Sequence, residues 1–258
     1  MTYELLTVPC LEDNYAFLLH NYLSGETLLV DVPDPAPIKA ALDAQGWALT
    51  DILLTHHHWD HVDGLAPLLA LLPSKPRVIG AKADAHRLPA LDAEVSEGEP
   101  LTICGARANV FDVSGHTMNH IAVYIQAAGV VFTADSLMAL GCGRLFEGTP
   151  AQMWESLQKL RNLPLETRVC SGHEYTETNA RFAATIEPDN PSLISRIDEI
   201  TKARANGLPT VPSTLAQELA TNPFLRADNP DLQTAQNLIN HSSADVFAHI
   251  RKKRDTFQ

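Results

Sequence analysis

The sequence has little basic charge and no long hydrophobic run. Its 258 residues include 19 Lys and Arg against 31 Asp and Glu, a formal net charge of −12. Proteins that neutralise nucleic-acid phosphates need a basic surface, so this balance argues against general nucleic-acid binding. The longest apolar runs, such as "APLLALL", fall far short of the ~20 residues that a membrane-spanning helix needs. We therefore expect neither a nucleic-acid partner nor a membrane partner.

Paired cysteines and a secretion signal are also missing. The four cysteines, Cys10, Cys104, Cys142 and Cys170, are widely spaced and form no CxxC pair. This spacing argues against a disulfide framework and against a cysteine-type zinc site. The N-terminal segment has neither the basic start nor the apolar run of a signal peptide. We expect a monomer in the reducing cytoplasm, with the composition of an ordinary globular protein.

The first two-thirds of the chain alternates short β-branched runs with helical patterns. A capping-box spacing from Thr149 to Gln152, with proline between, predicts the start of another helix. Strands are expected at 27–32, 51–55, 77–81, 101–105, 108–113 and 167–172, a hairpin at 121–135 with Gly129 in its turn, and helices at 35–46 and 64–73. After His173 only helices are expected, at 177–186, 191–207, 213–220 and 243–255. The sequence predicts an α/β layered domain followed by an all-helical region.

Five metal-capable side chains crowd the stretch "THHHWDH", directly after the predicted strand 51–55. Alternate side chains of extended backbone share a face, so His56 and His58 are expected to point one way and His57 the other. Asp60 and His61 lie past the turn and can reach the same space from another side. Four ligands are more than one open zinc site needs, which favours two ions and needs further partners.

Two other histidines follow predicted strands in small-residue turns. His116 lies in "SGHTMNH" and His173 in "CSGHEY", so both are candidate partners. Asp135 also ends a strand, but it is one of 31 acidic residues, and a turn or cap role is its default reading. The other histidines lack this setting and are expected to be structural or exposed: His20, His86, His120, His241 and His249.

Six motifs together resemble glyoxalase II (hydroxyacylglutathione hydrolase) of the metallo-β-lactamase superfamily: "THHHWDH", "GHT", "FTAD", "GCGRLFEG", "GHEYT" and "RKKRDTF". The resemblance implies an αββα metallo-β-lactamase-like sandwich at 1–173 as the catalytic domain. It further implies a helical substrate-binding domain at 174–258. Two divalent metal ions would be present, zinc in preference to iron or manganese. The ligand sets implied are His56, His58 and His116 for one ion, Asp60, His61 and His173 for the other, and Asp135 as the bridge.

The resemblance also implies a reaction and a substrate. The thioester of S-(2-hydroxyacyl)glutathione, typically S-D-lactoylglutathione, would be hydrolysed to glutathione and D-lactate, as in methylglyoxal detoxification. Asp60 and Asp135 would be the catalytic carboxylates. Substrate contacts would come from Arg144, Phe146, Tyr175, Arg251 and Arg254. Phe146 stands where some members have tyrosine, and Asp63 and Asn119 replace customary glycines.

Three alternatives remain at this stage. A lactonase or another thioesterase shares the histidine motif, but the helical tail with Arg251 and Arg254 argues against it. A glutathione-persulfide dioxygenase would hold one iron on two His and one Asp, whereas this chain keeps a second ligand set. A metal-binding protein without activity is the third, and the complete ligand sets argue against it.

Overall fold

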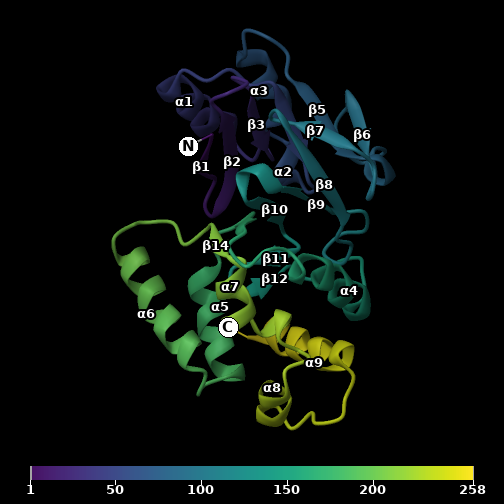
Figure 1. Ribbon diagram of the computed structural model, residues 1–258, viewed down its shortest axis with the longest axis vertical. Coiled ribbons are helices and arrows are strands. Elements are labelled where there is room, and N and C mark those ends of the chain that lie inside the picture. Colours follow the sequence, from purple (N-terminus) through teal and green to yellow (C-terminus); the bar gives the residue numbers. More distant parts are fainter. Residues whose placement is uncertain (1, 258) are drawn as a thin grey trace. The chain divides into compact units, whose positions relative to one another are not determined.

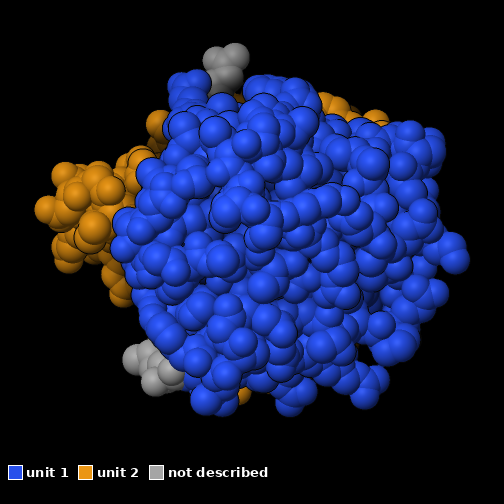
Figure 2. Space-filling model, turned by 90° about the horizontal axis from the view of Figure 1, so that it is seen from above, with its two compact units in different colours: residues 1–112, 119–134 blue, residues 113–118, 135–258 orange. Residues whose placement is uncertain are grey.

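The computed structural model describes residues 2–257, which form two compact units (Figure 2). Unit 1 runs to Asp112 and includes Asn119–Ala134. Unit 2 comprises Val113–Met118 and the chain from Asp135 onward. No helix of the described part is both long and apolar enough to cross a membrane.

The first sheet of unit 1 joins an antiparallel hairpin to parallel strands. Its strands stand in chain order: β1 (Tyr3–Cys10), β2 (Asn14–Asn21), β3 (Thr27–Val30), β4 (Asp51–Leu54), β5 (Arg77–Ala81) and β6 (Ala93–Val95). Strands β1 to β3 pair antiparallel, and β3 to β6 pair parallel. Parallel neighbours require crossover connections. These contain α1 (Pro35–Gln45), α2 (Trp59–Val62) and α3 (Leu65–Leu71), as Figure 1 shows.

Apolar side chains hold the crossover helices on this sheet. Ile38 of α1 and Leu68 of α3 share one buried cluster with Leu29 and Ile52 of the strands. Burying each such side chain contributes about 1.5–3 kcal/mol. Helix α1 begins and ends as its sequence predicts, because Asp34 caps its first turn and Gly46 adopts φ 69 at its end. The parallel strands therefore have fixed carboxyl ends from which functional loops can leave.

The second set of strands in unit 1 is an antiparallel meander. Its strands are β7 (Leu101–Ile103), β8 (Ala106–Asp112), β9 (Ile121–Ile125) and β10 (Val130–Ala134). Consecutive strands pair with one another. The predicted hairpin at 121–135 is confirmed, with Gly129 at φ 62 in its turn. Phe17 of β2 and Phe132 of β10 lie 5.9 Å apart between ring centroids, which places aromatic packing between the two sheets.

Unit 2 contains short strands and most of the helices. Its elements are β11 (Leu137–Met138), β12 (Gly141–Cys142), α4 (Pro150–Arg161), β13 (Arg168–Ser171), α5 (Thr176–Ile186), α6 (Pro191–Ala205), β14 (Ser213–Thr214), α7 (Leu215–Thr221), α8 (Pro230–Ala235) and α9 (Ser243–Thr256). Helices α5 and α6 lie side by side (Figure 1), and Ala183 and Leu193 belong to their common buried cluster. The capping box that starts α4 at Thr149 is present as predicted.

The expectation of helices only after His173 is wrong in one detail. Ser213–Thr214 forms β14, which pairs antiparallel with β13. Two residues are too few to show an alternating pattern, and the helix α7 follows immediately, so the sequence signal of the helix conceals the strand. The N-terminal hairpin β1–β2 was likewise not expected from the sequence.

Candidate metal centre

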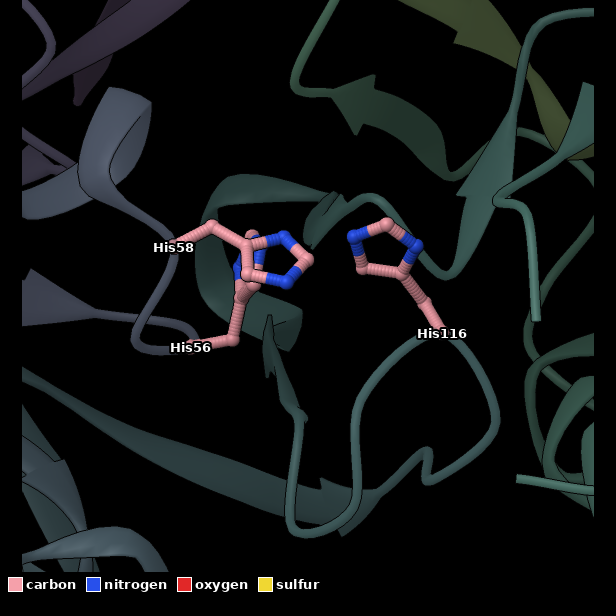
Figure 3. Close-up of side chains that lie close together, drawn as sticks. All are labelled: His56, His58 and His116. Carbon is pink, nitrogen blue, oxygen red and sulfur yellow. The ribbon is translucent and has the colours of Figure 1, made fainter. Parts of the chain in front are cut away.

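The loop after β4 presents two of the predicted histidines together. Because β4 lies between the parallel strands β3 and β5, this loop leaves the carboxyl edge of the sheet, where α/β sheets hold ligands. The rings of His56 and His58 have centroids 4.8 Å apart and lie next to each other in Figure 3. His57 turns instead to Asp84, with Nδ1 and Oδ2 3.1 Å apart. The expected alternation of side-chain direction is therefore present.

The short helix α2 brings Asp60 and His61 to the same region of unit 1. His61 is fully buried, its ring centroid is 4.2 Å from that of His56, and its Nε2 is 3.8 Å from Asp60 Oδ2. Asn14 of β2 donates through Nδ2 to both the backbone oxygen and Oδ2 of Asp60, each at 3.1 Å. All four side chains predicted as ligands from this stretch thus gather within unit 1.

Asp31 is a buried residue of this site that the sequence reasoning missed. Its Oδ1 accepts the backbone N–H of Thr55 at 2.9 Å, and its Oδ2 lies 2.8 Å from both Thr55 Oγ1 and His61 Nδ1. Asp31 directly follows β3, at the same sheet edge as the histidine loop. This position after a predicted strand could have marked it as a candidate site residue. His120, expected to be structural or exposed, is structural: it is buried and stacks on His56 at 4.5 Å.

Unit 2 holds the other three predicted ligands. His116 lies in the loop after β8, which Figure 3 shows, while Asp135 follows β10 and His173 follows β13. Oδ2 of Asp135 is 3.4 Å from His116 Nε2 and 3.3 Å from His173 Nε2. All three side chains are buried. One carboxylate oxygen therefore lies between two imidazole nitrogens.

Hydrogen bonds to the far side of each ring assign the nitrogen that can bind a metal. Nδ1 of His61 bonds to the Asp31 carboxylate, and Nδ1 of His116 is 2.8 Å from the backbone oxygen of Arg144. Because both oxygens only accept, each Nδ1 donates, and the lone pair of the neutral ring is on Nε2. Metal-binding histidines in proteins almost always have such a partner on the opposite nitrogen.

The donor set fits a divalent transition metal. Neutral imidazole with carboxylate is the ligand combination that zinc, iron and manganese accept. Two donor atoms that each lie about 2.0–2.1 Å from one ion at a tetrahedral angle are about 3.4 Å apart. The two separations at Asp135 Oδ2, 3.4 and 3.3 Å, match this value. The chain therefore carries a divalent metal site.

Arg251 and Arg254 of α9 are both engaged by neighbouring protein groups. Arg251 is buried, and it donates through Nη1 to the backbone oxygen of Cys142 at 2.9 Å and through Nε to Asp255 Oδ1 at 3.0 Å. Arg254 donates through Nε and Nη2 to Asn179 Oδ1, each at 3.3 Å. Burial lowers the pKa of Arg254, and the charge of Arg251 lowers it further. Cationic charge is thus concentrated at this end of unit 2.

Arg144, Phe146 and Tyr175 are more accessible. The Arg144 side chain is 59% exposed, and its Cζ lies 5.8 Å from the ring centroid of Phe146. Nε of Arg144 is 3.8 Å from Asp255 Oδ1, the atom that also accepts from the buried arginine of α9. Tyr175 stacks on His173, with ring centroids 4.7 Å apart. The exposed guanidinium and the two aromatic rings therefore belong to the same unit as His116, Asp135 and His173.

Two departures from the resemblance have simple structural accounts. Asn119 has φ 66, the left-handed region that asparagine tolerates, and its Nδ2 donates to the backbone oxygen of Ala83 at 3.2 Å. Asp63 ends α2 and is exposed to solvent.

The fold is that of the metallo-β-lactamase superfamily, whose model matches residues 14–173. Two solved structures share it at 21% identity. One is the BLEG-1 B3 metallo-beta-lactamase, with a TM-score of 0.66 over 86% of this chain and 99% of that chain. The other is ETHE1 from Myxococcus xanthus, with a TM-score of 0.65 over 100% of both chains. The predicted αββα class is confirmed.

More specific matches cover the whole chain. A model described as "Hydroxyacylglutathione hydrolase C-terminus" matches residues 174–257. Proteins named hydroxyacylglutathione hydrolase are 62% identical in Jannaschia sp. (strain CCS1), over 98% of each chain, and 58% identical in Ruegeria pomeroyi, over 100% of each chain. The chain belongs to the hydroxyacylglutathione hydrolase family, and the resemblance read from its motifs is confirmed.

Proposed function

We propose that this protein hydrolyses the thioester of S-(2-hydroxyacyl)glutathione, with S-D-lactoylglutathione as the main substrate. Water adds to the acyl carbon, the carbon–sulfur bond breaks, and glutathione and D-lactate leave. The observation that carries the proposal is the match to hydroxyacylglutathione hydrolases along the full chain, at 62% identity to one relative. The role in the cell would be methylglyoxal detoxification in the cytoplasm.

We propose further that the predicted ligands of unit 1 and unit 2 together hold two metal ions, with zinc as the first choice. One ion would be bound by His56, His58 and His116, the second by Asp60, His61 and His173, with Asp135 as the bridge. The proposal is supported by the Nδ1 anchors of His61 and His116, which leave Nε2 as the ligand atom. When bound, such ions lower the pKa of water to near neutrality and polarise a carbonyl oxygen.

The residues of the chain orient the reacting groups. Asp60, held by Asn14 at 3.1 Å, would accept the proton of the attacking water. Asp135 would fix the separation of the two ligand sets through its single oxygen between His116 and His173. The leaving thiolate of glutathione has a free pKa near about 8.5, so it needs little protonation as it departs.

The glutathione portion would be recognised by the basic end of unit 2. We propose a catalytic domain at 1–173 and a helical substrate-binding domain at 174–258. The contacts would come from Arg144 and Phe146 of the first and from Tyr175, Arg251 and Arg254 of the second. Arg144 and Arg251 share the single carboxylate of Asp255, and Arg254 bonds to the neutral Asn179, so the cluster keeps a local excess of positive charge in a chain of net charge −12. Such a patch attracts an anionic tripeptide.

Relative rates on different substrates test the function. The wild-type protein is assayed with S-D-lactoylglutathione, with simple lactones and with glutathione persulfide plus oxygen. We expect thioester cleavage to dominate and elemental analysis to find about two divalent ions per chain. Cleavage of lactones without cleavage of the thioester, or persulfide-dependent oxygen uptake with one iron, would refute the proposal.

A further inference from the structure

A short hairpin of unit 2 depends on side chains from distant parts of the chain. Strands β11 and β12 are two residues each, and the turn between them holds Leu140 at φ 56. A bulky residue at positive φ is strained and persists only where the surrounding structure holds it. The hairpin lies between Asp135 and Arg144 in the chain, so its position affects where both residues lie.

Two buried side chains, both 0% exposed, bind the turn of this hairpin. Glu218 of α7 accepts the backbone N–H of Leu140 through Oε2 at 2.9 Å. Asn222 donates through Nδ2 to the backbone oxygens of Met138 and Gly141, both at 3.0 Å. Nδ2 of Asn222 is also 3.0 Å from Glu218 Oε2, so its two N–H groups are shared among three acceptors and join the two side chains into one unit.

Two further side chains complete the set. Asn179 of α5 donates through Nδ2 to the backbone oxygen of Ala139 at 3.0 Å. Arg251 of α9 donates to the backbone oxygen of Cys142 at 2.9 Å. Each of the five residues from 138 to 142 therefore has a backbone group bonded by a side chain from the helical region. We call these four side chains the collar: Asn179, Glu218, Asn222 and Arg251.

The end of the hairpin fixes the start of the substrate-contact segment. A Cβ at Gly143 would lie 1.9 Å from the backbone oxygen of Asp135, so residue 143 is pressed directly against that segment. The next residue, Arg144, accepts from His116 through its backbone oxygen and extends an exposed side chain. A shift of the hairpin therefore moves the Arg144 guanidinium directly.

We infer that Glu218 and Asn222 are positioning residues which hold the hairpin and thereby place Arg144 for a carboxylate of the glutathione portion. The inference rests on the proposed function. Neither residue touches the substrate, and both act through the backbone of residues 138–141. A plain stabilising role for the same hydrogen bonds is the alternative, and it predicts lower thermal stability without altered ligand binding.

The experiment compares two collar variants with a matched control. Asn222→Ala removes both carbonyl contacts, and Glu218→Gln keeps the size of the side chain but alters its bonding. The control is Glu187→Gln, because the buried Glu187 carboxylate binds Arg226 at 2.8 and 2.9 Å and makes no hydrogen bond to the hairpin in the described structure. Each variant is made in the wild type and in Arg144→Ala. The measurements are the Kd of glutathione by calorimetry, KM and kcat for S-D-lactoylglutathione, metal content and Tm.

Each collar variant is expected to weaken glutathione binding and raise KM about ten-fold, which corresponds to 1.4 kcal/mol of lost binding. The value of kcat and the metal content should stay near those of the wild type. In the Arg144→Ala background the same change should add less than about two-fold, because two residues that act through one contact are not additive. The control should lower Tm and leave the Kd unchanged.

Three results would overturn the inference: a lower Tm with an unchanged Kd, an equal effect with and without Arg144, or loss of bound metal. Glu218→Gln decides the question if Asn222→Ala does not fold. It removes the charge that pairs with the buried Arg196, and the control matches this loss because Glu187→Gln removes the charge that pairs with Arg226. Failure of the proposed function can be distinguished from failure of this inference. A wild-type protein that binds glutathione without cleaving the thioester refutes the function alone, and the Kd series then judges the inference. A wild-type protein that does not bind glutathione refutes both.

Discussion

Asp31→Asn tests how unit 1 holds His61, one of its proposed metal ligands. Asp31 is 2% exposed, and its two oxygens bond to the Thr55 N–H, the Thr55 hydroxyl and His61 Nδ1 at 2.8–2.9 Å. Asparagine has the same shape, but one of its two acceptor positions becomes an NH2 group. That group must face a donor, so at least one hydrogen bond becomes a donor–donor contact.

The expected magnitude follows from two independent sources. A hydrogen bond to a charged group contributes about 1.5–3 kcal/mol, and the loss is greater when a buried donor is left unsatisfied. Changes to the outer partner of a metal-binding histidine typically weaken metal affinity about 10–100-fold, or about 1.4–2.7 kcal/mol. The two ranges agree. We expect the metal affinity of Asp31→Asn to fall by about 10–100-fold.

Competition with a chromophoric chelator measures this affinity, and Asp84→Asn is the matched control. Asp84 is also buried and also bonds a histidine through Nδ1, but that histidine is His57, which we propose is not a ligand. The control should lose stability and keep its metal affinity. If Asp31→Asn retains full metal affinity, or if both variants lose it equally, the reasoning from the Nδ1 anchor is wrong.

Three further predictions follow from the same contacts. His57→Ala should keep the full metal content by elemental analysis, because its ring turns to Asp84; loss of one equivalent would contradict the assignment. Arg254→Ala should raise KM about ten-fold with little change in kcat, because it removes ground-state binding. The control Lys252→Ala, at an exposed residue, should change neither KM nor kcat. An unchanged KM for Arg254→Ala would refute the proposed role of Arg254. Burial raises the pKa of Cys142 to about 11, so the thiol stays protonated at pH 8 and should not react with a thiol reagent until the protein unfolds. Rapid labelling of this cysteine in the folded enzyme would contradict that expectation.

The elements with strong local signals were predictable. The helix 35–46 has proline at its start and glycine at its end, and the hairpin 121–135 has its glycine at the turn. Strand β2 was missed because all eight of its residues are buried, so it shows no alternation. A strand that is buried on both faces cannot be assigned by periodicity alone. Strand β14 was missed because it is only two residues long.

The sequence by itself determined the metal-binding stretch. A strand, an extended loop and a short helix set the directions of His56, His58 and His61 through local backbone geometry, and the family motifs supplied the class of enzyme. Only the tertiary structure decided what holds these groups in place. Asp31 is 30 residues from His61, and Glu218 is 78 residues from the backbone N–H that it accepts. Local spacing carries no information about such partners, because chain folding alone brings them within hydrogen-bond distance.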